Sequence, residues 1–340
     1  MIRFSRRKLL QAGSALTGVS LLLPSWSAKA QAQSQFKLAA VYAGIVTDQS
    51  WNQSAHDALN AAQKKMGFEY AFVEKVAPPD QPEALADFAR RGYNLVLGHS
   101  GQFIGPVKQV APQFPNTKFL VSNGGTGENN IISVQFNNLH SGFLAGIVAG
   151  QMTKSKKLAF ITATKFKAAD DQLRGFELGA QSIDPGITVT PTYTNDYADV
   201  AKAKEAALAQ ISAGVDVIWH ALDNAFVGVI EAATEKKVFV IGNYTDQLSF
   251  GPETVLTSSI ANIGGAVASV ITLAVEGKIE PKDYSIGAED PSVISLGEFN
   301  TLVPEAIKTR SLAIKTELSE DKIRFQTCQV NGQESWCMNG

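Results

Sequence analysis

The residues with the clearest capacity for chemistry lie in the stretch 47–54, which holds Asp48, Ser50, Trp51 and Asn52. An indole offers a flat surface for stacking, an amide both donates and accepts hydrogen bonds, and a carboxylate accepts them. Together these groups suit a planar polar heterocycle. The alternative interpretation is structural: Asp48 or Ser50 caps a following helix, and Trp51 is part of a packed wall.

Side chains of the same kinds follow other short apolar runs of the chain. They are His99, Gln102 and Phe103, then Trp219, His220 and Asp223, then Asn243, Tyr244 and Asp246. If these runs are parallel strands, the residues beyond their carboxyl ends border one crevice. The set is rich in aromatic and amide groups and poor in cations, so it suits an uncharged ligand better than a phosphate or a carboxylic acid.

The elements that must position these residues are short β-rich runs that alternate with segments of helical period. This alternation predicts an α/β fold with parallel sheets. A first set has runs at 37–42, 68–73, 95–98, 119–122 and 131–136, with helices at 53–66, 82–91 and 104–114. A second set has runs at 158–161, 188–191, 215–219 and 238–242, with helices at 171–182, 200–213 and 226–236. We therefore predict two Rossmann-like, doubly wound lobes of similar layout.

The remainder of the chain closes both lobes, with runs at 255–260 and 292–296 and helices at 262–275 and 302–318. The division that follows is residues 35–137 plus about 262–292 for lobe 1, and 138–261 plus about 293–340 for lobe 2. The chain then crosses between lobes at 136–138, near 258–262 and near 296–299. Three short crossings predict a hinge about which the lobes rotate over a ligand.

The first thirty residues read as an export signal rather than as part of the fold. A basic front at Arg3, Arg6, Arg7 and Lys8 precedes an interrupted apolar stretch and small residues around position 28–30. The arginine pair is typical of a twin-arginine signal. The apolar stretch is short for a membrane span, and the cleavage region holds no cysteine. We expect a periplasmic protein without a lipid anchor.

Charge and cysteine content narrow the class of partner. The leader holds five of the 30 basic residues and none of the 32 acidic ones, so the rest of the chain carries a net charge of about −7. This balance argues against nucleic acid and a basic membrane patch as partners. Cys328 and Cys337 are the two cysteines of the sequence, and in an oxidising compartment one disulfide is the expected use. A thiolate metal site is the weaker alternative because no histidine lies nearby.

The enzyme interpretation depends on Gly98-His99-Ser100-Gly101-Gln102, which resembles the start of a nucleophile elbow. The G-x-S-x-G pattern requires glycine where Gln102 stands. An aspartate and His220 follow in hydrolase order, so a secreted α/β hydrolase using Ser100 stays as the alternative. No phosphate-binding glycine loop is present, and the four histidines lack metal-ligand spacing. We expect no enzyme activity, no cofactor and no metal.

Five segments together resemble the basic membrane protein family of type I periplasmic solute-binding proteins. They are 48–54, similar to the family's D-x-S-F-N-Q-S; 143–146, Phe-Leu-Ala-Gly; 174–180, Arg-Gly-Phe-Glu-Leu-Gly-Ala; 214–218, Gly-Val-Asp-Val-Ile; and 242–247, similar to G-x-D-x-D-Q. The resemblance covers most of the chain after the leader. It implies a monomer that binds a purine-like solute for the permease subunits of an ABC importer.

The resemblance also implies roles for single residues. Trp51 takes the place of an aromatic that stacks on the base, Asn52 that of an amide bonding its edge, and Trp219 would be the opposing aromatic. Tyr244 and Ala261 stand where nucleoside binders hold ribose with an aspartate and a lysine. The loop from Gly98 lacks the acid that reads the purine edge and offers His99 and Gln102.

We therefore expect a binding protein for a free nucleobase or similar heterocycle, with nucleosides disfavoured. A sensory binding protein that docks on a chemoreceptor is the other alternative.

Overall fold

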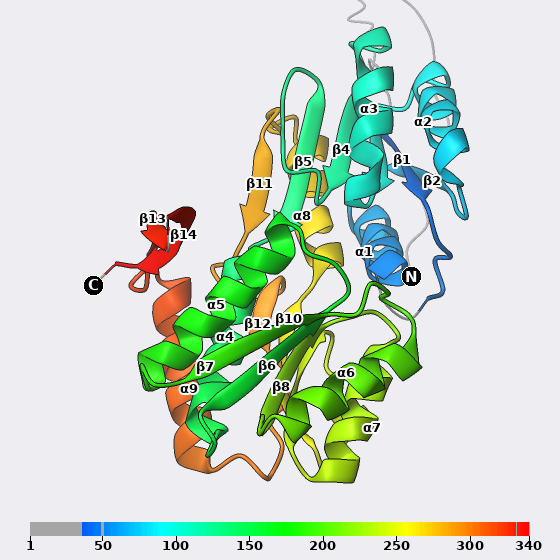
Figure 1. Ribbon diagram of the computed structural model, residues 1–340. Coiled ribbons are helices and arrows are strands. Elements are labelled where there is room, and N and C mark those ends of the chain that lie inside the picture. The colour runs from blue at the N-terminus through cyan, green and yellow to red at the C-terminus, as the bar shows by residue number, and fades with distance from the viewer. Residues whose placement is uncertain (1–35, 49–50, 331, 340) are drawn as a thin grey trace, which may run out of the picture. The chain divides into compact units, whose positions relative to one another are not determined.

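The computed structural model describes residues 36–48, 51–330 and 332–339, which form a mixed α/β structure built on two six-stranded sheets (Figure 1). The predicted export signal lies outside the described residues. Each sheet is covered by helices on both faces, as expected for doubly wound α/β units. We use lobe 1 and lobe 2 for the parts of the chain built on the first and the second sheet.

Lobe 1 contains a wholly parallel sheet in the order β11-β5-β4-β3-β1-β2. Its strands are β1 (Lys37–Tyr42), β2 (Glu69–Val73), β3 (Leu95–His99), β4 (Lys118–Ser122), β5 (Ile131–Phe136) and β11 (Asp283–Ile286). Leu38 and Ala40 of β1 pack under α1 (Trp51–Met66) and α8 (Ile263–Val275). Their neighbours Ala39 and Val41 pack under α2 (Gln81–Arg90) and α3 (Ile104–Val110). Successive side chains of the strand point to opposite faces, so β1 packs against helices on both sides of the sheet.

Lobe 2 contains the second sheet, in the order β12-β10-β9-β8-β6-β7, with β12 antiparallel to β10. Its strands are β6 (Lys157–Thr162), β7 (Thr188–Tyr193), β8 (Val217–Ala221), β9 (Phe239–Tyr244), β10 (Val255–Ala261) and β12 (Ile294–Leu296). One face packs against α4 (Asn138–Met152) and α5 (Lys167–Ile183), and the other against α6 (Val200–Ser212) and α7 (Phe226–Lys236). The predicted fold class is confirmed.

The chain passes three times between the two sheets. Asn137 follows β5 and accepts hydrogen bonds from the first backbone N–H groups of α4, and Asn262 follows β10 and caps α8 in the same way. The third passage lies between β11 and β12, because β12 already pairs with β10 from Ile294 onward. The prediction of a crossing at 296–299 is therefore wrong by several residues.

Two of the sequence segments that resemble the family form a helix–helix contact rather than a binding surface. A Cβ on Gly146 of α4 would lie 2.3 Å from the carbonyl oxygen of Phe176. A Cβ on Gly175 of α5 would lie 2.2 Å from the carbonyl oxygen of Leu139. The backbones of α4 and α5 are therefore in direct contact, which only glycine permits at these positions.

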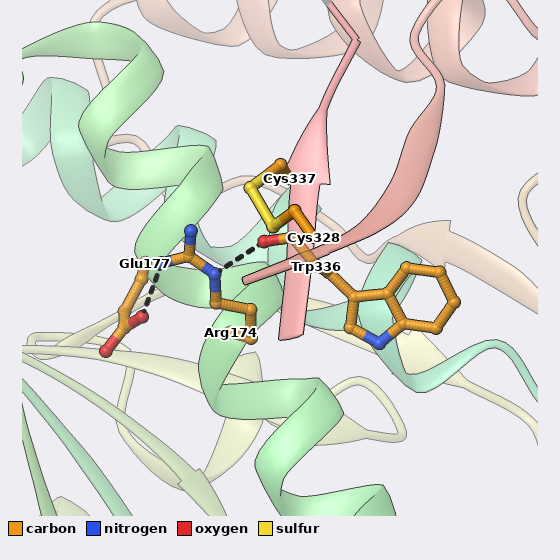
Figure 2. Close-up of a disulfide and its surroundings, with 5 residues drawn as sticks. All are labelled: Arg174, Glu177, Cys328, Trp336 and Cys337. Atoms are coloured by element: carbon orange, nitrogen blue, oxygen red, sulfur yellow. Dashed lines mark hydrogen bonds and ion pairs between the residues drawn. A yellow bond between two sulfur atoms is a disulfide. The ribbon is translucent and has the colours of Figure 1, made fainter. Parts of the chain in front are cut away.

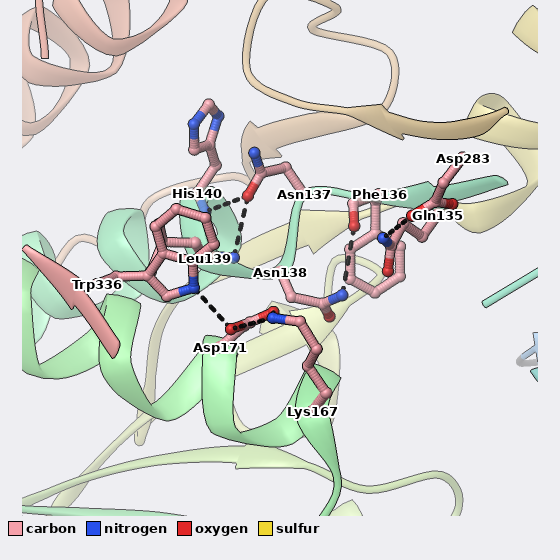
Figure 3. Close-up of polar contacts among 10 residues, drawn as sticks. All are labelled: Gln135, Phe136, Asn137, Asn138, Leu139, His140, Lys167, Asp171, Asp283 and Trp336. Atoms are coloured by element: carbon pink, nitrogen blue, oxygen red, sulfur yellow. Dashed lines mark hydrogen bonds and ion pairs between the residues drawn. The ribbon is translucent and has the colours of Figure 1, made fainter. Parts of the chain in front are cut away.

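The C-terminal part consists of α9 (Glu305–Ser319) and a hairpin of β13 (Phe325–Val330) and β14 (Gln333–Met338). Cys328 and Cys337 form a disulfide across this hairpin (Figure 2). The Nε of Arg174 on α5 donates a hydrogen bond of 2.8 Å to the carbonyl oxygen of Trp336. The Trp336 indole in turn donates to Asp171, at 2.7 Å, so α5 holds the hairpin at two points (Figure 3).

Candidate functional site

A cavity of about 450 Å³ lies beside the carboxyl ends of the strands and is lined by residues of both lobes. Its lining residues are Trp51, Gln53, Ser54, Asp57, Leu222, Phe226, Asn243, Tyr244, Thr245, Asp246, Gln247, Ile260, Ala261, Asn262 and Ile263. None of these residues is a lysine, an arginine or a histidine. The size falls in the range of small-molecule sites in proteins.

Trp51 is the first residue of α1 and provides the aromatic surface of lobe 1. Its indole stacks on the buried imidazole of His99, with ring centroids 5.2 Å apart and an interplanar angle of 23°. Because a carbonyl can only accept, the Nε2–H of His99 donates to the Trp51 carbonyl oxygen at 3.1 Å. Its Nδ1 then accepts from the Ser122 hydroxyl at 2.9 Å. Burial lowers the pKa of His99 to about 4, so the imidazole is a neutral support for the indole.

Phe226 is the first residue of α7 and provides the aromatic surface of lobe 2. The ring stacks on the buried imidazole of His220, with centroids 5.7 Å apart and an interplanar angle of 13°. His220 shares a hydrogen bond of 2.9 Å with the side chain of Gln247, and burial lowers the pKa of His220 to about 4. Each lobe therefore places an aromatic residue, supported by a buried neutral histidine, on the cavity.

Trp219 does not provide the opposing aromatic surface, and that prediction is wrong. The side chain is fully buried between the sheet and α5, with ring centroids 5.0 Å from Phe160 and 5.2 Å from Phe176. Its position on β8 directs it to the α4–α5 face, because successive strand residues point to opposite faces. Sequence reasoning missed Phe226, although it shares one signal with Trp51: an aromatic at the first position of a helix that follows a strand.

Asp48 and Asn52 support the first turn of α1. The Asp48 carboxylate accepts hydrogen bonds from the backbone N–H groups of Asn52 and Gln53, both at 3.0 Å. It also accepts one from the Asn52 side-chain amide at 2.7 Å. The expected role of Asn52 in bonding a ligand edge is therefore not supported, since this amide already binds Asp48. Ser50 lies outside the described residues.

Two other predicted site residues lie away from the cavity. Phe103 is fully buried in the core beneath α2 and α3, so its prediction as a ligand contact is wrong. Gln102 is exposed on a short 3₁₀ turn (Gly101–Phe103) and is not a lining residue. His99 and His220 act through Trp51 and Phe226 instead of lining the cavity themselves.

The segment from Asn243 to Gln247 lines the cavity, but its amides are engaged within the protein. The Asn243 side chain donates to the His220 carbonyl oxygen at 2.9 Å and accepts from the Tyr244 backbone N–H at 2.9 Å. The Gln247 side chain donates to the Asn243 carbonyl oxygen at 3.1 Å. Asp246 accepts from the backbone N–H groups of Leu248 and Glu298. These bonds fix the loop, so the cavity is less rich in available amides than its sequence predicts.

Burial also shifts the pKa values of Tyr244 and Asp223 in lobe 2. Tyr244 has a backbone φ of +68°, and burial followed by the charge of Asp223 raises the pKa of its hydroxyl. Asp223 is half-buried and is not itself a lining residue, although Leu222 before it in the chain and Phe226 after it line the cavity. Burial, and then the charge of Asp48 in lobe 1, raise the pKa of Asp223 to about 6.

The described residues also bear on the metal-site and hydrolase alternatives. Within residues 36–48, 51–330 and 332–339, no group of three or more histidine, cysteine or acidic side chains is placed to hold a metal ion. Ser100 belongs to lobe 1, whereas His220 is buried in lobe 2 and bonds Gln247. No helix in the same ranges is long and apolar enough to span a membrane.

Comparison with known proteins places the chain in a family. Residues 36–323 match the profile of the Bmp family, described as ABC transporter substrate-binding protein PnrA-like. The chain belongs to this family. Its fold and family are those of solute-binding proteins rather than of enzymes, which agrees with the resemblance seen in the sequence.

Relatives in the Bmp family carry several descriptions. The transcriptional activator protein med of Bacillus subtilis is 28% identical over 275 residues, covering 81% of this chain and 86% of that protein. A purine-binding protein of Brucella abortus is 25% identical over 291 residues, covering 85% of this chain and 81% of that protein. The ABC transporter nucleoside-binding protein BmpA of Lactococcus lactis is 27% identical over 255 residues, covering 68% of this chain and 73% of that protein.

Solved structures share the fold at low identity. A transcriptional activator of the comK gene from Bacillus halodurans superimposes with a TM-score of 0.74 and 24% identity, covering 84% of this chain and 98% of that one. A solute-binding protein of an ABC transporter system from Aeropyrum pernix gives a TM-score of 0.72 and 19% identity, covering 87% and 94%. The two-lobed architecture is therefore that of ABC solute-binding proteins.

Proposed function

We propose that this Bmp-family protein binds a purine base or a closely related planar heterocycle and delivers it to the permease of an ABC importer. The observation that carries the proposal is the cavity between Trp51 and Phe226, one aromatic from each lobe. Two such surfaces suit a flat ring, and stacking on an aromatic contributes roughly 1–3 kcal/mol per base. The purine-binding and nucleoside-binding relatives support the same class of ligand.

The mechanism contains binding and closure without a bond-making step. The ligand stacks first on Trp51, and lobe 2 then brings Phe226 and the Asn243–Gln247 segment over its other face. Closure is favoured only by the free energy that the ligand gains from the second lobe. The predicted twin-arginine leader supports export to the periplasm, and we propose that the closed form meets the permease subunits there as a monomer.

The cavity favours a free base over a nucleoside. Tyr244 and Ala261, which replace the charged ribose partners of nucleoside binders, both line it. A ribose beside an alanine and a phenol would lose charged hydrogen-bond partners, and each unmade bond at a buried site costs about 1–3 kcal/mol. Nucleosides should therefore bind more weakly than their bases.

The test is calorimetry of the purified protein with adenine, guanine, hypoxanthine and xanthine, each paired with its nucleoside. The proposal expects at least one base to bind with a micromolar or lower Kd and to exceed its nucleoside by tenfold or more. Glucose and an amino acid serve as ligands of unrelated shape. If a nucleoside binds more tightly than every base, the preference for bases is wrong; if only glucose or the amino acid binds, the proposed function is wrong.

A further inference from the structure

Among the acidic residues around the cavity, Asp223 alone has a carboxylate without a partner in the described part of the chain. Asp48 accepts hydrogen bonds from the first turn of α1, and Asp246 accepts two from backbone N–H groups. Asp57 accepts one from Gln53, at 3.3 Å. Asp223 uses only its backbone groups, which bond Tyr197 and Phe226. Its carboxylate therefore keeps its full capacity to accept hydrogen bonds.

The surroundings of Asp223 join this carboxylate to the cavity. Leu222 and Phe226, on either side of it in the chain, both line the cavity. The charge of Asp223 also raises the pKa of Tyr244, which is another lining residue. Burial and the negative charge of Asp48 disfavour its ionised form. A half-buried carboxylate that no cation neutralises lowers the stability of the fold. Such groups are typical of binding sites.

We propose that Asp223 selects a heterocycle that presents two adjacent N–H donors, as the N1–H and 2-amino groups of guanine do. This inference rests on the proposed function and names the ligand edge that the same site reads. A carboxylate has two acceptor oxygens and no donor, so it matches a pair of N–H groups bidentately. Hypoxanthine offers one such donor, and xanthine presents a carbonyl oxygen in place of the second.

The described residues that line the cavity include no lysine, arginine or histidine, and this affects which ligand charge the cavity accepts. The charged residues that line the cavity, Asp57 and Asp246, are both acidic, and the charge of Asp48 acts on Asp223. Negative potential disfavours anionic ligands and favours donor-rich neutral or cationic ones. The order expected for the parent protein is guanine, then hypoxanthine, then xanthine.

The test compares the parent with Asp223→Asn at pH 7.5 by competition binding at micromolar concentrations of guanine, hypoxanthine and xanthine. In the parent, guanine should bind about 10- to 100-fold more tightly than hypoxanthine, the effect of one further hydrogen bond to a charged group. An asparagine presents one acceptor and one NH₂ donor, so the variant should lose this preference and bind xanthine better than the parent does. Glu253→Gln is the matched control, because it removes one negative charge from an exposed residue that does not line the cavity.

The outcomes separate the inference from the proposed function. Purine bases that bind with the same guanine-to-hypoxanthine ratio in Asp223→Asn as in the parent would overturn the role of Asp223 and leave the proposed function intact. An equal loss of preference in Glu253→Gln would also overturn the assignment, since the loss of a negative charge far from the ligand would then suffice. If no purine base binds the parent at all, the inference and the proposed function are both wrong.

Discussion

Truncation of Phe226 and of Trp219 should have opposite consequences, because one ring lines the cavity and the other is core. Phe226→Ala removes the stacking surface of lobe 2, so affinity for a purine base should fall by about 5- to 150-fold, which corresponds to 1–3 kcal/mol. The side chain is only half-buried, so its loss should lower the free energy of unfolding by about 1 kcal/mol.

Trp219→Ala should instead destabilise the fold by about 3–5 kcal/mol, because a fully buried indole loses its contacts with Phe160 and Phe176. The loss should lie toward the lower figure, since the buried indole N–H has no hydrogen-bond partner in the described residues and its removal relieves that cost. Urea unfolding measures both free energies, and calorimetry well below the unfolding midpoint measures the affinities.

The pair of variants can refute the assignment of the two rings. If Phe226→Ala binds its base as tightly as the parent, the aromatic surface of lobe 2 is misplaced. If Trp219→Ala loses affinity while the free energy of unfolding stays within 1 kcal/mol of the parent value, Trp219 contacts the ligand and its burial has been misread. Trp219→Phe, which keeps an aromatic ring in the core, is the control that should retain both folding and affinity.

Three further outcomes follow from the described contacts. Asp223→Asn should stabilise the unliganded protein by about 1–3 kcal/mol at pH 7.5 in thermal unfolding, because it removes a carboxylate whose pKa is raised to about 6. The gain should shrink as the pH falls through 6 and vanish near pH 4; a constant gain would contradict this cause.

Replacing Cys328 and Cys337 by serine should weaken the terminal hairpin by about 2–3 kcal/mol, seen as faster hydrogen exchange in β13 and β14 with unchanged ligand affinity. Gly146→Ala should destabilise the fold more than Gly150→Ala, since the added Cβ would lie 2.3 Å rather than 3.0 Å from its nearest atom in α5; equal unfolding midpoints would contradict the close contact of α4 and α5.

The sequence predicts the layers of this fold well because each element has its own local signal. Alternating β-rich and helical segments identify both sheets, and 48–54 identifies Trp51 as a residue of the cavity. Those signals depend on periodicity and on residue type, which are readable without coordinates. The sequence does not predict the strands β11, β13 and β14, since they are short or partly exposed and lack a continuous apolar run.

The direction of single side chains is where sequence reasoning fails. Every residue of β8 is buried, so no polar alternation shows that Trp219 faces α5 while its neighbour His220 faces the other layer. The amides of Asn52, Asn243 and Gln247 look available for a ligand, but hydrogen bonds to other groups of the protein engage them. This competition between the ligand and partners within the protein is visible only once partners and distances are known.

The central claim is that the two lobes enclose a planar heterocycle between Trp51 and Phe226 and release it chemically unchanged. The most direct measurement is mass spectrometry of the small molecule set free when the protein, purified without added ligand, is denatured. We predict a nitrogen heterocycle of purine size that rebinds to the refolded protein without a change in mass. A sugar or an amino acid recovered in equal molar amount with the protein would contradict the account.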